Sequence, residues 1–358
     1  MPELRPFQEL LEDYVRHVSG QRCSIPAFRR ASEGWETEIL LFSIEPPAPE
    51  FGGLRHLAAR VYPWPWQADR VKAEFLLLRG LFETGYPVPR VVRFEPDASL
   101  LGGPFFVMEQ VRGSLLGYKY TKGTEQEKRD VSVVFGDLLA RLHRIDPAPF
   151  LGEGAAWRDR RSALTSLEPE ILRSFLEPSS IARELEPIFV WMEEHRPVLE
   201  GGETCLLHGD FHLWNIMLAE DEKGTLGGLP RPVVVDWGQA GLGDPRHDIA
   251  QSMLLSKTQN MPGVAESCLT AYQYASGRHL EHLEVFEILA LARRLGATLV
   301  CLADGPETLG LRPELVPFLL KRLNHLDGLC NLLEQQSSIR LPGVRGLLAR
   351  WASTETVR

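Results

Sequence analysis

The sequence predicts an α+β protein with a small N-terminal lobe, made of an antiparallel sheet and a helix, and a larger, mostly helical C-terminal lobe. Strand-like apolar runs separated by turn residues prevail up to about residue 111, and apolar residues at helical spacing prevail beyond Gly113. We therefore expect two domains, residues 1–110 and 111–358, with a hinge near 109–114.

Apolar spacing and turn residues define the expected elements of the first lobe. An amphipathic helix and a connector are expected within residues 1–30, where Phe7, Leu11 and Val15 recur at helical spacing. The pattern then predicts strands at 39–44 and 54–62, a helix at 67–84, and strands at 91–94 and 105–111.

The second lobe shows helical periodicity, interrupted by short strands at 216–218 and 232–235 around a polar loop, 219–231. The predicted helices cover residues 124–145, 180–199, 260–277, 281–303, 313–335 and 341–352.

Composition narrows the class of protein. Apolar runs all stay short of the twenty residues that a transmembrane helix needs, and the N-terminus lacks a signal-peptide pattern. The five cysteines are scattered and contain no CxxC pair, so we expect free buried thiols in a reducing compartment and a cytoplasmic location. The net charge of −9 argues against nucleic acid as a partner. We expect no membrane partner, and a monomer or homodimer.

The most informative segment is His208-Gly-Asp210-Phe-His212-Leu-Trp-Asn215. Its His, Asp and Asn have the spacing of the kinase catalytic loop H-R-D-x-x-x-x-N. In that chemistry Asp210 would orient a substrate hydroxyl and accept its proton, and the amide oxygen of Asn215 would bind magnesium. His212 is interpreted as a structural residue of the loop.

A second carboxylate follows at the distance that this chemistry requires. The buried run Val233-Val-Val ends in Asp236-Trp-Gly238, 21 residues after Asn215 and across a hairpin-like loop. This is the order of a catalytic loop and a magnesium-binding Asp-Phe-Gly turn. The two segments together are far more specific than either alone.

Three features of the first lobe fit nucleotide binding. Arg60, near the end of a strand, and Glu74, on the next helix, suit a cation that a carboxylate holds on the phosphates. Gly34 precedes a strand and could let the backbone approach phosphates. The strand that runs out through Glu109 and Val111 could read an adenine edge through its backbone.

The chain resembles the aminoglycoside phosphotransferase and choline kinase-like family, relatives of the protein kinases. Matching pieces run from about Gly34 to Asp248, and the most specific are residues 208–215, Val235-Asp-Trp237 and Gly243-Asp-Pro-Arg-His-Asp248. The resemblance implies a two-lobed protein-kinase-like fold, ATP (or sometimes GTP) as phosphate donor, Mg²⁺, and a small-molecule hydroxyl as acceptor.

The resemblance also implies roles for individual residues. Asp210 would be the catalytic base, Asn215 and Asp236 the magnesium ligands, and residues 109–111 the adenine hinge. Asp248 would brace the catalytic loop near His208. Arg60 stands where many relatives have lysine, and its guanidinium can still bind phosphate.

Three other interpretations are open. The pattern His208-x-Asp210-x-His212 is compatible with a metal-dependent hydrolase, although Asn215 and Asp236 would then have no role. A catalytically silent nucleotide-binding protein is a second alternative. A protein kinase is a third, but only 11 residues separate Asp236 from Asp248, which leaves little room for a peptide platform.

The acceptor itself is not legible in the sequence. Residues 114–358 carry 26 basic and 33 acidic groups, which slightly favours a cationic acceptor. Aminoglycoside-, choline- and sugar-like acceptors are all compatible with the motifs.

Overall fold

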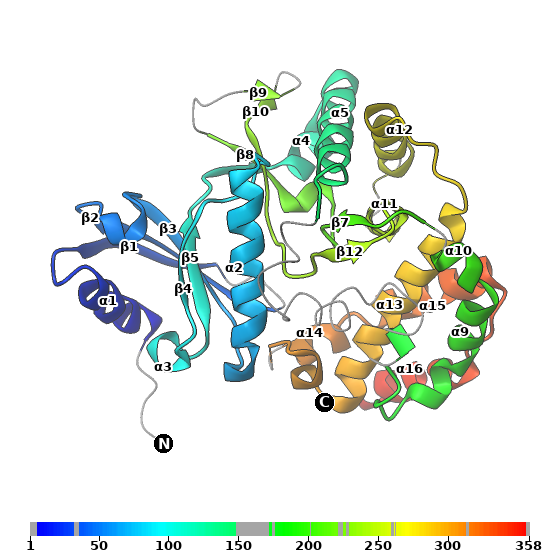
Figure 1. The fold of residues 1–358 in the computed structure, drawn as a ribbon. Helices are drawn as coiled ribbons and strands as arrows, with labels where there is room; N and C mark the ends of the chain where they lie inside the picture. The colour runs from blue at the N-terminus through cyan, green and yellow to red at the C-terminus, as the bar shows by residue number, and fades with distance from the viewer. Residues whose placement is uncertain are drawn as a thin grey trace. The chain divides into compact units, whose positions relative to one another are not determined.

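The structure is a computed structural model that describes residues 6–31, 36–147, 172–173, 176–200, 202–220, 225–226, 229–258, 261, 263–312 and 315–355. The chain forms two compact units (Figure 1), one of residues 1–112 with 310–312, the other of residues 113–309 with 313–358. Gly34 and part of the predicted loop 219–231 lie outside the described residues.

The first unit is built on a five-stranded antiparallel sheet with the strand order β1-β2-β3-β5-β4. Its strands are β1 (Ser24–Ala31), β2 (Glu38–Glu45), β3 (His56–Val61), β4 (Val91–Glu95) and β5 (Phe105–Glu109). The β1 segment was predicted to be a connector, and this prediction is wrong. An edge strand such as β1 buries little of either face, so its side chains do not show the apolar alternation of an inner strand.

The two faces of this sheet are covered by different helices. Helices α1 (Phe7–Val18) and α3 (Ala98–Leu101) pack on one face, where the ring of Tyr14 meets Phe105 at 5.1 Å. Helix α2 (Ala68–Glu83) packs on the opposite face, where the ring of Phe75 lies 6.4 Å from Phe106 (Figure 1). Side chains alternate between the faces of a strand, so Arg60 of β3 points to the α2 side while Ala59 and Val61 join the α1 side.

A short piece of the C-terminal sequence belongs to the first unit. The indole N–H of Trp64 donates to the carbonyl of Leu311 (3.1 Å), and the Gln67 amide donates to the carbonyl of Gly310 (3.2 Å). Arg312 forms an ion pair with Glu38. The predicted division at 110/111 did not include these residues, because such tertiary hydrogen bonds leave no periodic signal in the sequence.

The second unit contains small sheets among helices. Strands β6 (Gly113–Leu115), β8 (Ile216–Ala219) and β11 (Pro232–Val234) form one, and β7 (Cys205–Leu207) pairs with β12 (Gly241–Gly243). A third pairs β9 (Thr225–Leu226) with β10 (Leu229–Pro230). The predicted strand at 105–111 is shorter than expected, since β5 ends at Glu109.

Helices make up most of the second unit. They are α4 (Leu116–Lys122), α5 (Glu125–Leu142), α9 (Ala182–Glu194), α10 (Arg196–Glu200), α11 (Arg246–Thr258), α12 (Val264–Ser276), α13 (Leu283–Asp304), α14 (Leu315–Leu320), α15 (Leu323–Ser337) and α16 (Pro342–Glu355). Helix α13 is the centre of the main apolar cluster and packs against α11 and α15. In the part of the chain that the structure describes, no helix is long and apolar enough to cross a membrane.

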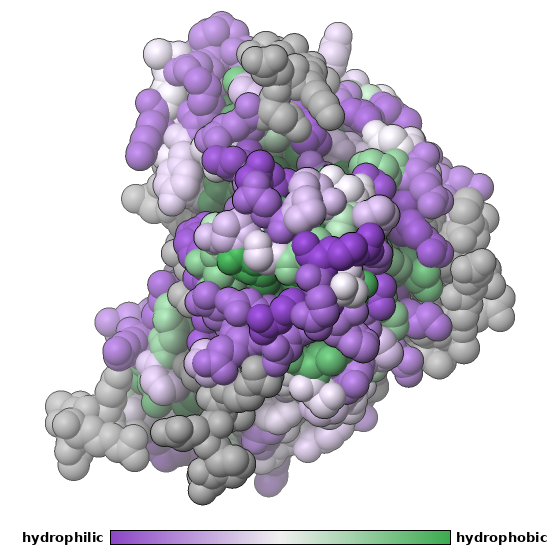
Figure 2. All heavy atoms as spheres, turned by 90° about the vertical axis from the view of Figure 1, so that its left-hand side faces the viewer, coloured by the Kyte–Doolittle hydropathy of each residue, from purple (hydrophilic) through white to green (hydrophobic). Residues whose placement is uncertain are grey.

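The exposed side chains and the cysteines are placed as the composition predicts. Hydrophilic side chains predominate on the face shown in Figure 2. The five cysteines are all buried and free, as predicted from their scattered positions.

Candidate active site

The segment 208–215 connects β7 to β8 and ends in a single 3-10 turn, Leu213–Asn215. The side-chain amide of Asn215 donates to the backbone carbonyl of Asp210 (2.9 Å) and lies 3.4 Å from its carboxylate oxygen Oδ2. With the amide nitrogen turned to Asp210, the amide oxygen of Asn215 is the atom that can face a cation.

The hairpin of β8 and β11 brings Asp236 to Asn215. Val234 pairs with Ile216, and the next residue, Val235, donates its N–H to the carbonyl of Asn215 over 2.9 Å. Asp236 follows at once with a left-handed backbone, φ 65°, which is unfavourable for a residue with a side chain. The local chain reversal at a strained, exposed carboxylate is of the kind found at functional sites.

Two side chains orient the carboxylate of Asp210. The amide of Gln251, on α11, donates to Oδ1 over 2.9 Å, and Nε2 of His212 lies 3.4 Å from Oδ2. Burial alone would raise the pKa of Asp210, but His212 and the hydrogen bond from Gln251 outweigh it and hold that pKa well below its usual range. The side chain remains 29% exposed, so an incoming hydroxyl can reach it.

Asp248, in the first turn of α11, binds the backbone at the start of the loop 208–215. Its fully buried carboxylate accepts the backbone N–H groups of His208 (2.9 Å) and Gly209 (2.7 Å). The ring of His143 contributes a third contact at 3.2 Å and is itself paired with Tyr272 (2.9 Å). Burial opposes the charge, but these hydrogen bonds and nearby histidines lower the pKa of Asp248, so the carboxylate stays ionised.

Both histidines of the loop have structural contacts. Nδ1 of His208 accepts the N–H of Asp210 (3.3 Å) and its Nε2 donates to the carbonyl of Val235 (3.0 Å); burial lowers its pKa. His212 caps the 3-10 turn by accepting the N–H of Trp214 over 3.2 Å, and the Trp214 ring packs on Tyr118.

These contacts count against the hydrolase alternative. A ring with both nitrogens engaged, as in His208, cannot ligate a metal. Across the described ranges, no group of three or more His, Cys, Asp or Glu side chains could hold a metal ion. The oxygens of Asn215 and Asp236, brought to one end of a hairpin, instead suit a hard divalent cation such as Mg²⁺.

In the first unit, Arg60 and Glu74 form a buried ion pair. Nε of Arg60 lies 3.5 Å from Oε1 of Glu74, and their side chains are only 8% and 1% exposed. The hydroxyl of Tyr62 also donates to Glu74, which fixes the carboxylate on α2. The guanidinium is therefore held at the end of β3.

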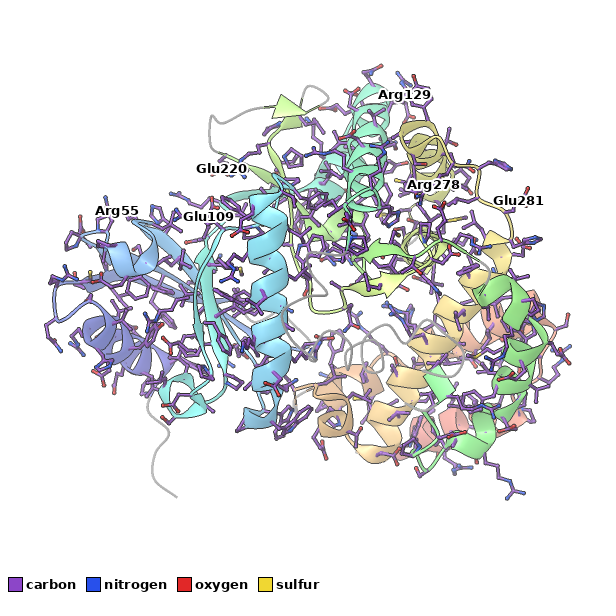
Figure 3. All side chains as sticks on the ribbon, in the orientation of Figure 1. Arg55, Glu109, Arg129, Glu220, Arg278 and Glu281 are labelled. Atoms are coloured by element: carbon purple, nitrogen blue, oxygen red, sulfur yellow. The ribbon has the colours of Figure 1, made fainter. Side chains whose placement is uncertain are left out.

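The strand end at Glu109 was predicted to read adenine. Glu109 lies at the end of β5 (Figure 3), and its N–H donates to the carbonyl of Arg90 over 2.8 Å. None of the described residues accepts a hydrogen bond from the N–H of Val111. Gly34, the other predicted nucleotide residue, lies outside the described residues.

Two polar residues near the loop were not predicted. Gln251 orients Asp210, and Arg293 of α13 donates to the carbonyl of Gly209 over 2.9 Å. Neither belongs to a local motif. For Gln251 the sequence offers a weak signal, since it lies three residues after Asp248 and so on the same side of a helix.

Solved structures of known phosphotransferases share this fold. Aminoglycoside 2'-phosphotransferase-IIIa in its GDP complex is 15% identical with a TM-score of 0.56, and the alignment covers 91% of this chain and 98% of that one. Macrolide 2'-phosphotransferase MphH of Brachybacterium faecium is 16% identical with a TM-score of 0.54, covering 84% and 95%. At these identities the likeness confirms the protein-kinase-like fold.

Curated relatives match only in part. Acyl-CoA dehydrogenase family member 10 of Mus musculus is 30% identical over 189 residues, which are 52% of this chain and 17% of that protein. Family member 11 of Rattus norvegicus is 26% identical over 193 residues, 52% of this chain and 23% of that protein. The chain thus matches less than a quarter of the length of these relatives.

The family assignment comes from the sequence profile. The profile described as the phosphotransferase enzyme family matches residues 30–273, about two thirds of the chain, including every motif on which the site was built. The chain belongs to this phosphotransferase family.

Proposed function

We propose that the protein is an ATP-dependent kinase of a small hydroxylated molecule, with Asp210 as its catalytic base. The observation that carries the proposal is the convergence of Asp210, Asn215 and Asp236 at one end of the β8–β11 hairpin. A carboxylate that can receive a hydroxyl, next to two oxygen ligands for a metal, is the minimum that phosphoryl transfer asks of a protein.

Asp210 would accept a hydrogen bond from the acceptor hydroxyl and align its oxygen with the γ-phosphorus. The new O–P bond forms as the bond to the β-phosphate oxygen breaks, ADP leaves, and the hydroxyl proton passes to Oδ1 or Oδ2 of Asp210. Because its pKa is held low, Asp210 is ionised at neutral pH but is a weak base. Its main contribution is therefore orientation, with proton transfer late in the reaction.

Mg²⁺, when bound by Asn215 and Asp236, would neutralise the charge that the transferring phosphoryl group and ADP carry. The strained backbone of Asp236 and the amide orientation of Asn215 prepare these oxygens before the metal arrives. Asp248 and His208 keep the loop in place, and His212 keeps Asp210 ionised.

For the nucleotide, Arg60 held by Glu74 would bind the phosphates. The carbonyl of Glu109 and the N–H of Val111 would contact the adenine edge, and Gly34 would lie near the phosphates. Structures of this fold are described with ADP and with GDP, so GTP is a donor to be tested beside ATP.

The test is Asp210→Asn, assayed by ADP release on a panel of hydroxylated acceptors. We expect turnover to fall at least a hundredfold while nucleotide affinity stays within about threefold, because Asn keeps the shape but cannot take the proton. The matched control is Asp69→Asn, an exposed acid on α2. Full turnover in Asp210→Asn would remove the assigned role.

A second variant tests the metal assignment. Asp236→Asn removes one charge yet tolerates the left-handed backbone, so folding should be preserved. We expect Mg²⁺ to lose its effect on ATP affinity in this variant. Equal Mg²⁺ dependence in variant and parent would refute the assignment, and nucleotide binding without turnover on any acceptor would favour a catalytically silent protein.

A further inference from the structure

Helix α13 carries two consecutive arginines, Arg293 and Arg294, where it meets the loop 208–215. Most of its middle residues, such as Leu291, Ala292 and Leu295, are fully buried, whereas Arg293 and Arg294 are only partly buried. Nη2 of Arg293 donates to the carbonyl of Gly209 over 2.9 Å, so this turn of the helix lies directly against the residue that precedes Asp210.

Arg294 lacks the partner that a partly buried guanidinium normally has. Among the described residues, no carboxylate lies within ion-pair distance of it. Burial and the positive charge of Arg322 lower the pKa of Arg294, and the attraction of Asp210 opposes them. A partly buried guanidinium without a counter-ion can pair with an anionic group that a ligand brings.

More basic side chains stand beside it on the next helix. α15 packs against α13; Arg322 is the N-cap residue of α15, and His325 lies in its first turn. Arg322 lies over the ring of Phe318 at 4.1 Å. His325 is partly buried, and its pKa is lowered by burial and by the positive charges of Arg294 and Arg322. We call Arg293, Arg294, Arg322 and His325 the basic cluster.

The sign of this cluster is opposite to that of the whole second lobe. The excess of acidic residues in 114–358 led to the expectation of a cationic acceptor, but net charge does not report the charge at one site. Several of those acids are used elsewhere: Glu287 pairs with Lys257, Asp244 with Arg246, and Asp327 with Arg345. A cationic acceptor at the basic cluster would meet repulsion.

We propose that the acceptor is an anionic hydroxylated small molecule, whose carboxylate or phosphate binds Arg294 with help from Arg322 and His325 while its hydroxyl lies on Asp210. The proposal rests on the kinase function proposed above and names its substrate class. Arginine suits this role because its planar fork binds carboxylate and phosphate through two hydrogen bonds.

The experiment compares acceptors that differ only in charge. ADP release is measured with ATP and Mg²⁺ on hydroxy-carboxylates, on the matching hydroxy-carboxamides, on sugar phosphates and on kanamycin. We expect kcat/KM for an anionic acceptor to exceed that of its neutral counterpart at least tenfold. The hydroxy-carboxylate and sugar-phosphate arms show which anionic group is used.

Variants then locate the effect. Arg294→Gln should raise the KM for the anionic acceptor roughly 10- to 100-fold, since one charge-assisted hydrogen bond contributes that much, and should leave the KM for ATP unchanged. Arg294→Lys should recover part of the loss. The matched control is Arg129→Gln, an exposed arginine on α5 (Figure 3) whose guanidinium donates to the side-chain oxygen of Gln126.

A binding measurement separates this proposal from the kinase function. Inorganic phosphate is titrated calorimetrically into the parent and Arg294→Gln, with Mg²⁺ and a non-hydrolysable ATP analogue occupying the nucleotide site. Phosphate binding that is lost in Arg294→Gln, without turnover of any acceptor, would support the anion site and reject the kinase function. Preferred turnover of neutral or cationic acceptors, or an unchanged KM in Arg294→Gln, would overturn the anionic class, as would the absence of both phosphate binding and anionic turnover.

Discussion

The carboxylate of Asp248 accepts a hydrogen bond of 2.7 Å from the backbone N–H of Gly209. Gly209 has φ 79°, and a Cβ at this position would collide with the backbone oxygen of Gln239. The residue before Asp210 must therefore be glycine, and one fully buried carboxylate on α11 fixes its orientation. The position of Asp210, the proposed catalytic base, thus depends on Asp248 through the backbone of Gly209.

Asp248→Asn should weaken both the fold and the reaction. The substitution places an NH₂ group against one of two backbone donors and removes the buried charge that also contacts the ring of His143. We expect the free energy of unfolding to fall by about 2–4 kcal/mol, measured by urea denaturation, and kcat to fall with little change in nucleotide affinity. Asp69→Asn, on the surface of α2, should change stability by less than about 0.5 kcal/mol. Equal stability of parent and Asp248→Asn would contradict this account.

Gln251→Met should move the acidic limb of the pH–rate profile. The hydrogen bond from Gln251 helps to lower the pKa of Asp210, so its loss raises that pKa and protonates the base at a higher pH. Activity of the parent should thus persist to lower pH than that of the variant, as measured by kcat/KM from neutral pH down to the lowest pH at which both proteins stay folded.

Folding of Gln251→Met should be little affected. The side-chain oxygen of Gln251 is buried without a hydrogen-bond partner among the described residues, so replacing it removes an unsatisfied acceptor. Gln126→Met, on the exposed side of α5, is the control for the loss of an amide. An identical acidic limb in parent and Gln251→Met would show that Gln251 does not tune Asp210.

Glu74→Gln should impair nucleotide binding through Arg60. The buried guanidinium would lose its charged partner 3.5 Å away and turn from the position in which it can bind phosphate. We expect the KM for ATP to rise about tenfold or more and stability to fall by about 3 kcal/mol, with the acceptor KM unchanged. Glu83→Gln, exposed at the end of the same helix, should alter neither. A rise in acceptor KM alone would place Arg60 elsewhere in the reaction.

Two kinds of element were predictable from the sequence. Helices α2 and α5 bury mainly one side, so their apolar residues recur at helical spacing. Strands β2 and β3 are mostly buried on both faces, so they stand out as short apolar runs. Strand β1 carries Arg29 and Arg30 at a sheet edge, and the three-residue strands β7 and β12 are too short for a pattern. Helix α11 is buried along most of its length, so it has no polar face to reveal it.

Within the site, the residues of one loop could be predicted from their spacing in the sequence. The residues that other helices bring to the loop could not. Asp210 and Asn215 lie in the loop that leads into β8, and Asp236 follows β11, the partner of β8, so these three residues are close in the order of local elements. Gln251 and Arg294 reach the same place from α11 and α13, and only the packing of those helices determines which side chains arrive there.

His247 should make stability depend on pH in mildly acidic solution. Its ring is buried against Phe286, and burial lowers its pKa to about 3, with the attraction of Asp244 opposed by Arg246 and Arg293. In the unfolded chain the pKa of the histidine is near 6.5. Between that pH and about 3, the ring is protonated in the unfolded state but neutral in the folded state.

The stabilisation from neutral His247 is complete above about pH 6.5 and is lost progressively as the pH falls toward about 3, where the folded state also becomes protonated. The expected slope is about 1.4 kcal/mol per pH unit for this group, measured by urea denaturation from pH 7 to 4. His247→Gln cannot titrate, so its slope should be shallower by that amount even if its stability at pH 7 is lower. His17→Gln, an exposed histidine on α1, should keep the parent slope. A His247→Gln slope equal to that of the parent would mean that other groups govern acid unfolding.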